Sequence, residues 1–185
     1  MSFQHTALAQ AATSDDLVLL SQAAGTIGSP DPIVALRHMD CDPPAVVALA
    51  DQVEHSAARL RDASGEYRAG VGEISGGWSG EAHDAFAASA AELGSRYADT
   101  LEKTEQTAKA GRDVAANLDS LATGTAADAM SIAASVGEQC RQVLSGEREP
   151  QAVEAVNEAC REIVKRVQSS VASVGELAAT LSAIG

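Results

Sequence analysis

Two short polar clusters are the places where this chain could do chemistry. His38 and Cys41 flank Asp40, and His83 stands directly before Asp84. Imidazole, thiolate and carboxylate groups bind transition metals, and a His–Asp pair can act in acid–base catalysis. No second ligand pair is spaced to complete a metal site, and a His–Asp pair on a helix surface is ordinarily solvated. We therefore predict no metal, no cofactor and no catalytic residue, and a protein that is not an enzyme.

The three cysteines are the remaining reactive groups, and three cannot all pair within one chain. Cys140 and Cys160 fall on apolar rows of two successive predicted helices. If the turn between them centres on residues 145–149, they are staggered by about 6 Å along the axis. They either form a disulfide bond, which requires a turn centred nearer Pro150, or remain buried free thiols. Cys41 is expected to stay free.

The charge of the chain excludes two classes of ligand. Thirteen basic and 26 acidic residues give a net charge of −13, which repels nucleic-acid phosphates and anionic lipids. No stretch is apolar over the length of a membrane span. No charged segment precedes an apolar core as in a signal peptide, since the first basic residue is Arg37. We expect no nucleic-acid binding and no stable membrane insertion, with the chain either cytoplasmic or exported by a route that reads folded structure.

The composition predicts an all-α fold. Hydrophobic residues make up 45% of the chain but aromatic residues only 3%, and alanine is abundant. Small apolar side chains suit long helices that pack closely side by side. Residues 45–149 contain no proline, which favours unbroken helices over that span.

Two amphipathic patterns predict an antiparallel helical hairpin over residues 43–123. Asp42 and Pro43 have the character of a helix N-cap and first turn, and Gly76–Gly80 separates this helix from a second one that stops at Gly124. Apolar or small residues recur every seven positions, which gives each helix a seam for packing. The rows are Val46, Val53, Leu60, Tyr67 and Ile74 in the first helix, and Phe86, Leu93, Thr100, Thr107, Val114 and Leu121 in the second.

Residues 124–185 predict a second hairpin. A third helix starts near Thr125, and Pro150 opens a fourth. The fourth helix has two heptad rows: Val153, Cys160, Val167, Val174 and Leu181, then Val156, Ile163, Ser170, Leu177 and Ile184. The two antiparallel hairpins are expected to form an elongated four-helix bundle. Residues 1–42 form an N-terminal segment and linker, with a short helix capped by Ser14 that ends before Gly25.

The predicted tip of the first hairpin carries the run WSGEAHDAF, residues 78–86. Gly80 permits a tight turn, and Ala82 and Phe86 are one helical turn apart on the same face. Trp78 is the only tryptophan, at a place where a large aromatic ring has little core to fill.

This motif between two long helices resembles the Trp-x-Gly (WXG) family, in an extended form with a second hairpin. Members are helix-turn-helix proteins without signal peptides that pair into four-helix bundles and leave actinobacteria and firmicutes through type VII secretion. The resemblance implies that Trp78, Gly80, Ala82 and Phe86 form a secretion or interaction motif. It also implies a non-enzymatic secretion substrate or secretion-associated protein, whose partner is a WXG-like helical protein or the type VII secretion machinery. The second hairpin could instead replace the partner, and a homo-oligomer is also open.

The sequence departs from the family at one signal. Many exported pairs carry Tyr-x-x-x-Asp/Glu after the second helix, but Tyr67 is followed four positions on by Val71, and Tyr97 by Leu101. A partner would then have to supply the signal. The alternative is a cytosolic helical adaptor or chaperone for another secreted protein. A third hypothesis is a trafficking module that lacks the toxin domain which sometimes follows such hairpins.

Overall fold

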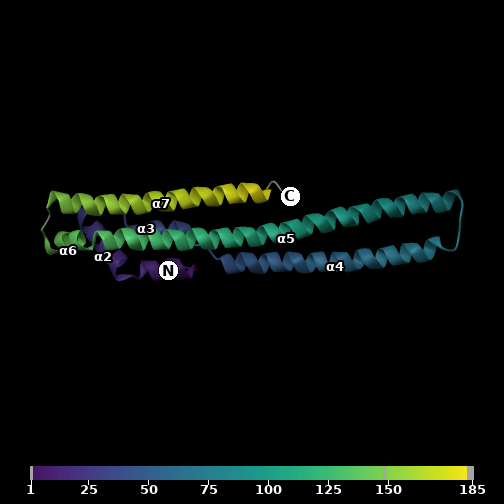
Figure 1. Ribbon diagram of the computed structural model, residues 1–185, viewed down its shortest axis with the longest axis horizontal. Coiled ribbons are helices and arrows are strands. Elements are labelled where there is room, and N and C mark those ends of the chain that lie inside the picture. Colours follow the sequence, from purple (N-terminus) through teal and green to yellow (C-terminus); the bar gives the residue numbers. More distant parts are fainter. Residues whose placement is uncertain (1, 148, 183–185) are drawn as a thin grey trace. The chain divides into compact units, whose positions relative to one another are not determined.

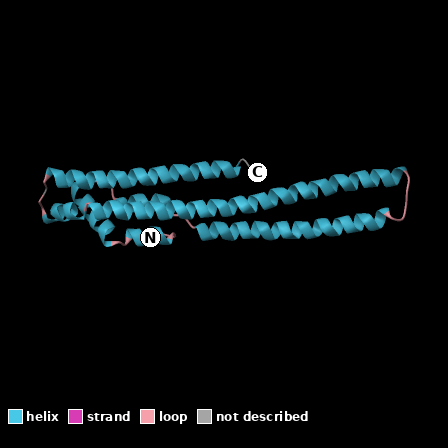
Figure 2. Cartoon of the chain, viewed as in Figure 1, coloured by secondary structure: helices cyan, strands magenta, loops and turns pink. Residues whose placement is uncertain are grey.

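A computed structural model describes residues 2–147 and 149–182. Within these residues every regular element is a helix, which confirms the all-α fold (Figures 1 and 2). In chain order the elements are α1 (Thr6–Ala12), α2 (Asp15–Ile27), α3 (Pro32–Leu36), the 3₁₀ turn η1 (Arg37–Met39), α4 (Pro43–Ser75), α5 (Glu81–Ser135), α6 (Gly137–Ser145) and α7 (Pro150–Ser182).

The chain divides into two compact units. The first, called here the core unit, comprises residues 1–43 and 115–179. The second, the hairpin unit, comprises residues 44–114 and 180–185. Ile184, predicted on the second row of the last helix, lies outside the described residues.

The core unit owes its stability to large apolar side chains that are removed from water. The largest fully buried ones are Leu8, Leu17, Leu20, Leu36, Pro32, Val156, Ile163, Cys140 and Cys160. All four leucines in this set come from the N-terminal segment. Helix α2 of this segment packs against α3 and against α6. The segment before residue 43 is therefore part of a core, a role for which its sequence showed no clear pattern.

Two helix ends differ from the sequence prediction. The N-terminal helix α2 begins after Ser14 as predicted, but the Ser14 hydroxyl does not cap it and donates instead to the Ala11 carbonyl oxygen at 2.8 Å. The helix continues past Gly25 to Ile27 because Ala23 and Ala24 are fully buried. The second long helix, α5, does not stop at Gly124 but continues to Ser135. A glycine inside a helix costs about 1 kcal/mol relative to alanine, and the burial of alanine side chains on both sides of Gly124 outweighs that cost. These alanines are Ala122, Ala126, Ala129 and Ala133, none more than 2% exposed.

Within the core unit, α7 lies beside the last part of α5. The hydroxyl groups of Thr125 and Ser170 are 2.8 Å apart, and Arg166 forms an ion pair with Asp128 at 3.7 Å. Pro150 is the first residue of α7, as its fixed φ angle predicted.

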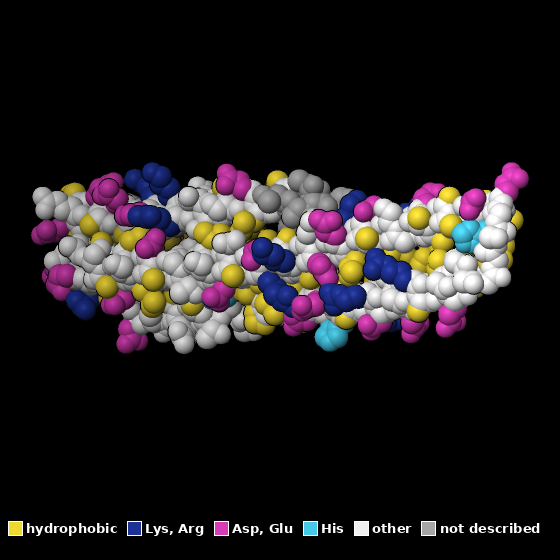
Figure 3. All heavy atoms as spheres, turned by 45° about the vertical axis from the view of Figure 1, so that its right-hand side comes forward, with side chains coloured by type: hydrophobic (Ala, Val, Ile, Leu, Met, Phe, Trp, Pro, Cys, Tyr) yellow, Lys and Arg dark blue, Asp and Glu magenta, His cyan; other side chains and the backbone are white. Residues whose placement is uncertain are grey.

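The hairpin unit consists mainly of α4 and the first part of α5, joined by residues 76–80. The start of α4 at Pro43 and the position of the turn confirm the sequence prediction. The buried side chains of this unit are small: Ala50, Ala57, Ser64, Ala90 and Ala108, none more than 7% exposed. Its larger apolar side chains are only partly covered, and Figure 3 shows hydrophobic side chains along the hairpin between its two helices.

Candidate interaction site on the hairpin

The tip of the hairpin is a tight turn followed directly by α5. Gly80 has a φ angle of 112°, a left-handed conformation that side chains other than that of glycine rarely adopt. The Asp84 amide donates to the Gly80 carbonyl oxygen at 3.1 Å, which starts the hydrogen-bond ladder of α5. Glu81 and Asp84 lie in the first turn, where the helix dipole favours negative charge.

Three rings meet at this turn. The indole of Trp78 lies edge-on to the imidazole of His83, with centroids 5.6 Å apart and planes at 84°. The same indole lies 6.0 Å from the ring of Phe86, tilted by 47°. Aromatic pairs at such distances contribute about 0.5–1.5 kcal/mol beyond simple burial. Trp78 nevertheless remains 41% exposed, so part of its ring is open to a partner.

The segment around this tip matches a known family. The sequence model described as WXG100, "Proteins of 100 residues with WXG", matches residues 38–121, which is less than half of the chain. This segment is similar to the WXG100 family, and the hairpin that it contains is called here the WXG100 hairpin. No curated protein and no solved structure gave a significant match to the chain.

The four predicted motif residues of the WXG100 segment have different positions in the structure. Trp78 and Phe86 are in ring contact, Gly80 makes the turn, and Ala82 is exposed on the first turn of α5. From the sequence, His83 was expected to be one half of a solvated polar pair, and its contact with the indole was not predicted. The imidazole Nδ1 does lie 3.1 Å from the Asp84 carboxylate, but the ring is only 26% exposed. The spacing of His83 and Phe86, three residues apart on one helix face, was the signal available in the sequence.

A shallow groove separates the two helices of the WXG100 hairpin below the tip. Its lining combines one aromatic ring with small side chains: Tyr67, Arg68, Val71, Ala87, Ala90, Ala91 and Gly94. The Tyr67 hydroxyl donates to the Ala90 carbonyl oxygen at 3.2 Å, and its ring lies 5.6 Å from that of Tyr97. Both tyrosines are thereby occupied in holding α4 to α5.

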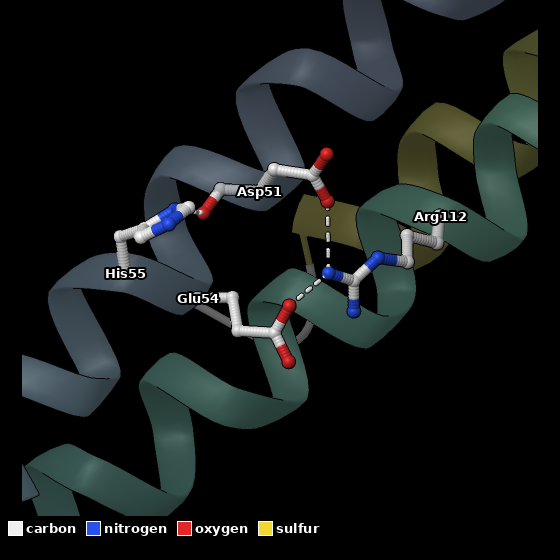
Figure 4. Close-up of polar contacts among 4 residues, drawn as sticks. All are labelled: Asp51, Glu54, His55 and Arg112. Atoms are coloured by element: carbon white, nitrogen blue, oxygen red, sulfur yellow. Dashed lines mark hydrogen bonds and ion pairs between the residues drawn. The ribbon is translucent and has the colours of Figure 1, made fainter.

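Ion pairs link the two helices farther from the tip. The Arg112 guanidinium on α5 donates to Asp51 at 2.9 Å and also to Glu54, both on α4 (Figure 4). The hydrogen bonds that Arg112 donates to Glu54 and then to Asp51 raise its pKa above the ordinary value. In a second ion pair the basic residue lies on α4 and the acidic one on α5, since Arg61 pairs with Glu105. These pairs are solvent-exposed, so they fix the alignment of the helices more than they stabilise them.

The core unit holds all three cysteines as free thiols. Burial, and then the proximity of Cys160, raises the pKa of Cys140 from 9.0 to about 11. Burial also raises the pKa of Cys160, and this effect is larger than the lowering caused by a hydrogen bond with Ser29. The pKa of the half-buried Cys41 is raised by burial and then by the charge of Asp40.

The predicted cysteine pair lies on α6 and α7. Cys140 is five residues before the end of α6 and Cys160 ten residues after the start of α7. With the helix ends level, this difference is about 7.5 Å along the axis. A disulfide bond would need a shift of that order, and its formation under oxidising conditions stays a prediction.

Asp40, considered above as a metal ligand, has another role. Its carboxylate accepts hydrogen bonds from the backbone amides of Gln4 at 2.8 Å and His5 at 3.1 Å, just before α1 begins. The buried His5 ring in turn places Nε2 3.1 Å from the Asp119 carboxylate of α5. Among the described residues, no group of three or more His, Cys, Asp or Glu side chains is arranged to hold a metal ion. In that same part of the chain no helix combines the length and hydropathy of a membrane span.

Proposed function

We propose that this chain is a non-enzymatic substrate or associated factor of type VII secretion that acts through protein–protein contacts of its WXG100 hairpin. The observation that carries the proposal is the incompletely covered apolar seam of the hairpin, which ends at a partly exposed tryptophan. Such a seam fits a helical hairpin of another protein molecule as its partner.

The seam has the character of half a helical bundle. Val53, Leu60 and Tyr67 are half-buried, while Leu49 is 61% and Leu93 42% exposed. Two helices alone cannot enclose side chains of this size. Because helices in proteins are stabilised mainly by the packing of their apolar faces, the exposed part of this seam leaves stabilisation unused. Each apolar side chain that a partner covers contributes about 1.5–3 kcal/mol when burial is complete. Pairing with another helical protein, WXG-like or a second copy, would supply this burial.

The tip supplies the surface for recognition by secretion machinery. Between Arg68 and Arg96 the chain has no lysine or arginine but four acidic residues: Glu73, Glu81, Asp84 and Glu92. A partly exposed indole within an acidic segment fits an apolar pocket with a basic rim. Aromatic residues are frequent energetic centres of such contacts.

A cytosolic adaptor or chaperone is the second candidate function. It is favoured by the two tyrosines, since neither Tyr67 nor Tyr97 is followed four positions on by an acidic residue. Under this reading the seam holds another secreted helical protein inside the cell. Under the first reading, the bound partner carries the missing signal and both proteins leave.

Deletion of the type VII secretion ATPase separates these candidates. The chain is measured in cytosol and culture filtrate of the producing cells, with a cytosolic enzyme as the control for lysis. Export predicts that the protein is in the filtrate of the parent strain and is retained in the deletion strain. Equal retention in both strains contradicts export and supports the adaptor.

A further inference from the structure

We infer that His83 is a positioning residue of the hairpin tip, which holds the indole of Trp78 in a fixed orientation on the first turn of α5. The inference deepens the proposed function, because a fixed indole is a better recognition surface than a mobile one. The positioning itself is a property of the chain alone and can be tested without any partner.

The contacts of the imidazole carry this inference. The His83 ring meets the indole edge-on at 5.6 Å, a shorter centroid distance than the 6.0 Å to Phe86. A perpendicular arrangement sets the positive edge of one ring against the negative face of the other. The indole is therefore held from two points on α5 that are one helical turn apart.

Asp84 fixes the imidazole in turn. Its carboxylate oxygen is 3.1 Å from Nδ1 of His83, which orients the ring when that nitrogen carries a proton. The backbone of Asp84 is fixed because its amide donates to the carbonyl oxygen of Gly80. Turn, carboxylate, imidazole and indole thus form one chain of contacts within residues 78–86.

The exposure of the residues shows why this arrangement needs a positioning group. Trp78 follows two glycines and precedes the turn at Gly80, so its backbone has few neighbours of its own. Without side-chain contacts, an indole that is 41% exposed would sample several rotamers. Restricting those rotamers before binding reduces the entropy lost when a partner immobilises the ring.

Because Trp78 is the only tryptophan, its fluorescence reports this contact directly. The variants are His83→Ala, which removes the ring, and His83→Phe, which keeps an aromatic edge at the same position. His55→Ala is the matched control, since His55 lies on the surface of α4 and bonds to the Asp51 carbonyl oxygen. Circular dichroism establishes that each full-length variant keeps its helix content.

The expected result is a red shift of the emission maximum, lower anisotropy and stronger acrylamide quenching for His83→Ala. His83→Phe should restore values near those of the unsubstituted chain, and His55→Ala should match them throughout. Emission, anisotropy and quenching that are unchanged in His83→Ala would overturn the inference. So would a change of the same size in His55→Ala.

Export of the same variants tests the link to function separately. Loss of one aromatic pair corresponds to a reduction of about 2- to 10-fold in an equilibrium constant. Export reduced to that extent in His83→Ala, with recovery in His83→Phe, supports both statements. A changed emission with full export of His83→Ala and Trp78→Ala upholds the positioning and contradicts the proposed role of the tip.

Discussion

A Cβ atom added to Gly111 would lie 3.1 Å from the Cβ of Ala50, closer than ordinary van der Waals contact. The two long helices of the hairpin therefore meet where one has no side chain and the other only a methyl group. Close approach of this kind brings the ion-pairing side chains of α4 and α5 within reach of each other. It also leaves the larger apolar side chains at the flank of the interface, where a partner can reach them.

This contact predicts opposite outcomes for two glycines in helices. Gly65→Ala in α4 should raise the free energy of unfolding by about 0.5–1 kcal/mol, because alanine favours helix and nothing lies within 4 Å of the new methyl group. Gly111→Ala should lack that gain, because its methyl group crowds Ala50. Urea unfolding of both variants measures the difference. An equal gain at the two sites would show that the helices are not closely packed there.

A second prediction concerns where the stability of the chain resides. Leu20→Ala removes a fully buried side chain from the core unit and should lower the free energy of unfolding by about 2–5 kcal/mol. Leu49→Ala alters a side chain that is 61% exposed on the hairpin, so it should change the free energy of unfolding by less than about 0.5 kcal/mol. Thermal and denaturant unfolding of the unpartnered chain provide the values. A Leu20 effect as small as that of Leu49 would show that the N-terminal segment is not part of the core.

A third prediction follows from the raised thiol pKa values. In the native protein Cys41 should react first with an aromatic disulfide reagent near pH 8, while Cys140 and Cys160 should react only as the chain unfolds. All three should react at once in denaturant. Rapid labelling of Cys140 in the native protein would mean that it is not buried.

The same thiol makes stability depend on pH in a defined direction. The folded chain holds the proton of Cys140 more tightly than the unfolded chain, so its contribution is complete below pH 9.0 and is lost as pH rises toward about 11. Cys140→Ala should weaken this alkaline loss. Intact mass measured before and after exposure to oxidised glutathione tests the remaining possibility of a Cys140–Cys160 bridge, which would lower the mass by two hydrogens.

A fourth prediction concerns the exposed ion pairs between α4 and α5. Arg112→Gln removes the charge that contacts both Asp51 and Glu54, so the stability of the variant should depend less on salt than that of the unsubstituted chain. Arg141→Gln is the control, because among the described residues Arg141 forms its ion pair within α6, with Glu138. The same salt dependence in Arg112→Gln and the unsubstituted chain would mean that the pairs across the hairpin do not form in solution.

The sequence was informative wherever backbone chemistry decides structure. Proline at 43 and 150 and the glycines before and after Trp78 correctly placed the two long helix starts and the turn. The end predicted at Gly124 was wrong because a local preference of about 1 kcal/mol was overcome by burial that only the folded core provides. The roles of Leu8 and Leu36 in that core depend on contacts with distant helices, which periodicity within a short segment cannot reveal.

The candidate site was predicted only in part, for a similar reason. Trp78 and Phe86 were recognisable from their types and spacing. The role of His83 depends on how the turn folds the indole back over α5. That geometry cannot be predicted from two neighbouring polar residues in the sequence. The close contact between the small residues Ala50 and Gly111 depends on how the two helices are aligned, which the sequence alone does not give.

Export of Trp78→Ala tests whether the exposed indole at the hairpin tip is needed for secretion. The variant and the unsubstituted chain are compared in cytosol and culture filtrate of the producing cells, with Val34→Ala as a control that alters an exposed apolar residue of the core unit. If the tip is recognised for export, Trp78→Ala folds but is retained in the cytosol, while Val34→Ala and the unsubstituted chain reach the filtrate. Export of folded Trp78→Ala at the level of the unsubstituted chain would contradict that recognition.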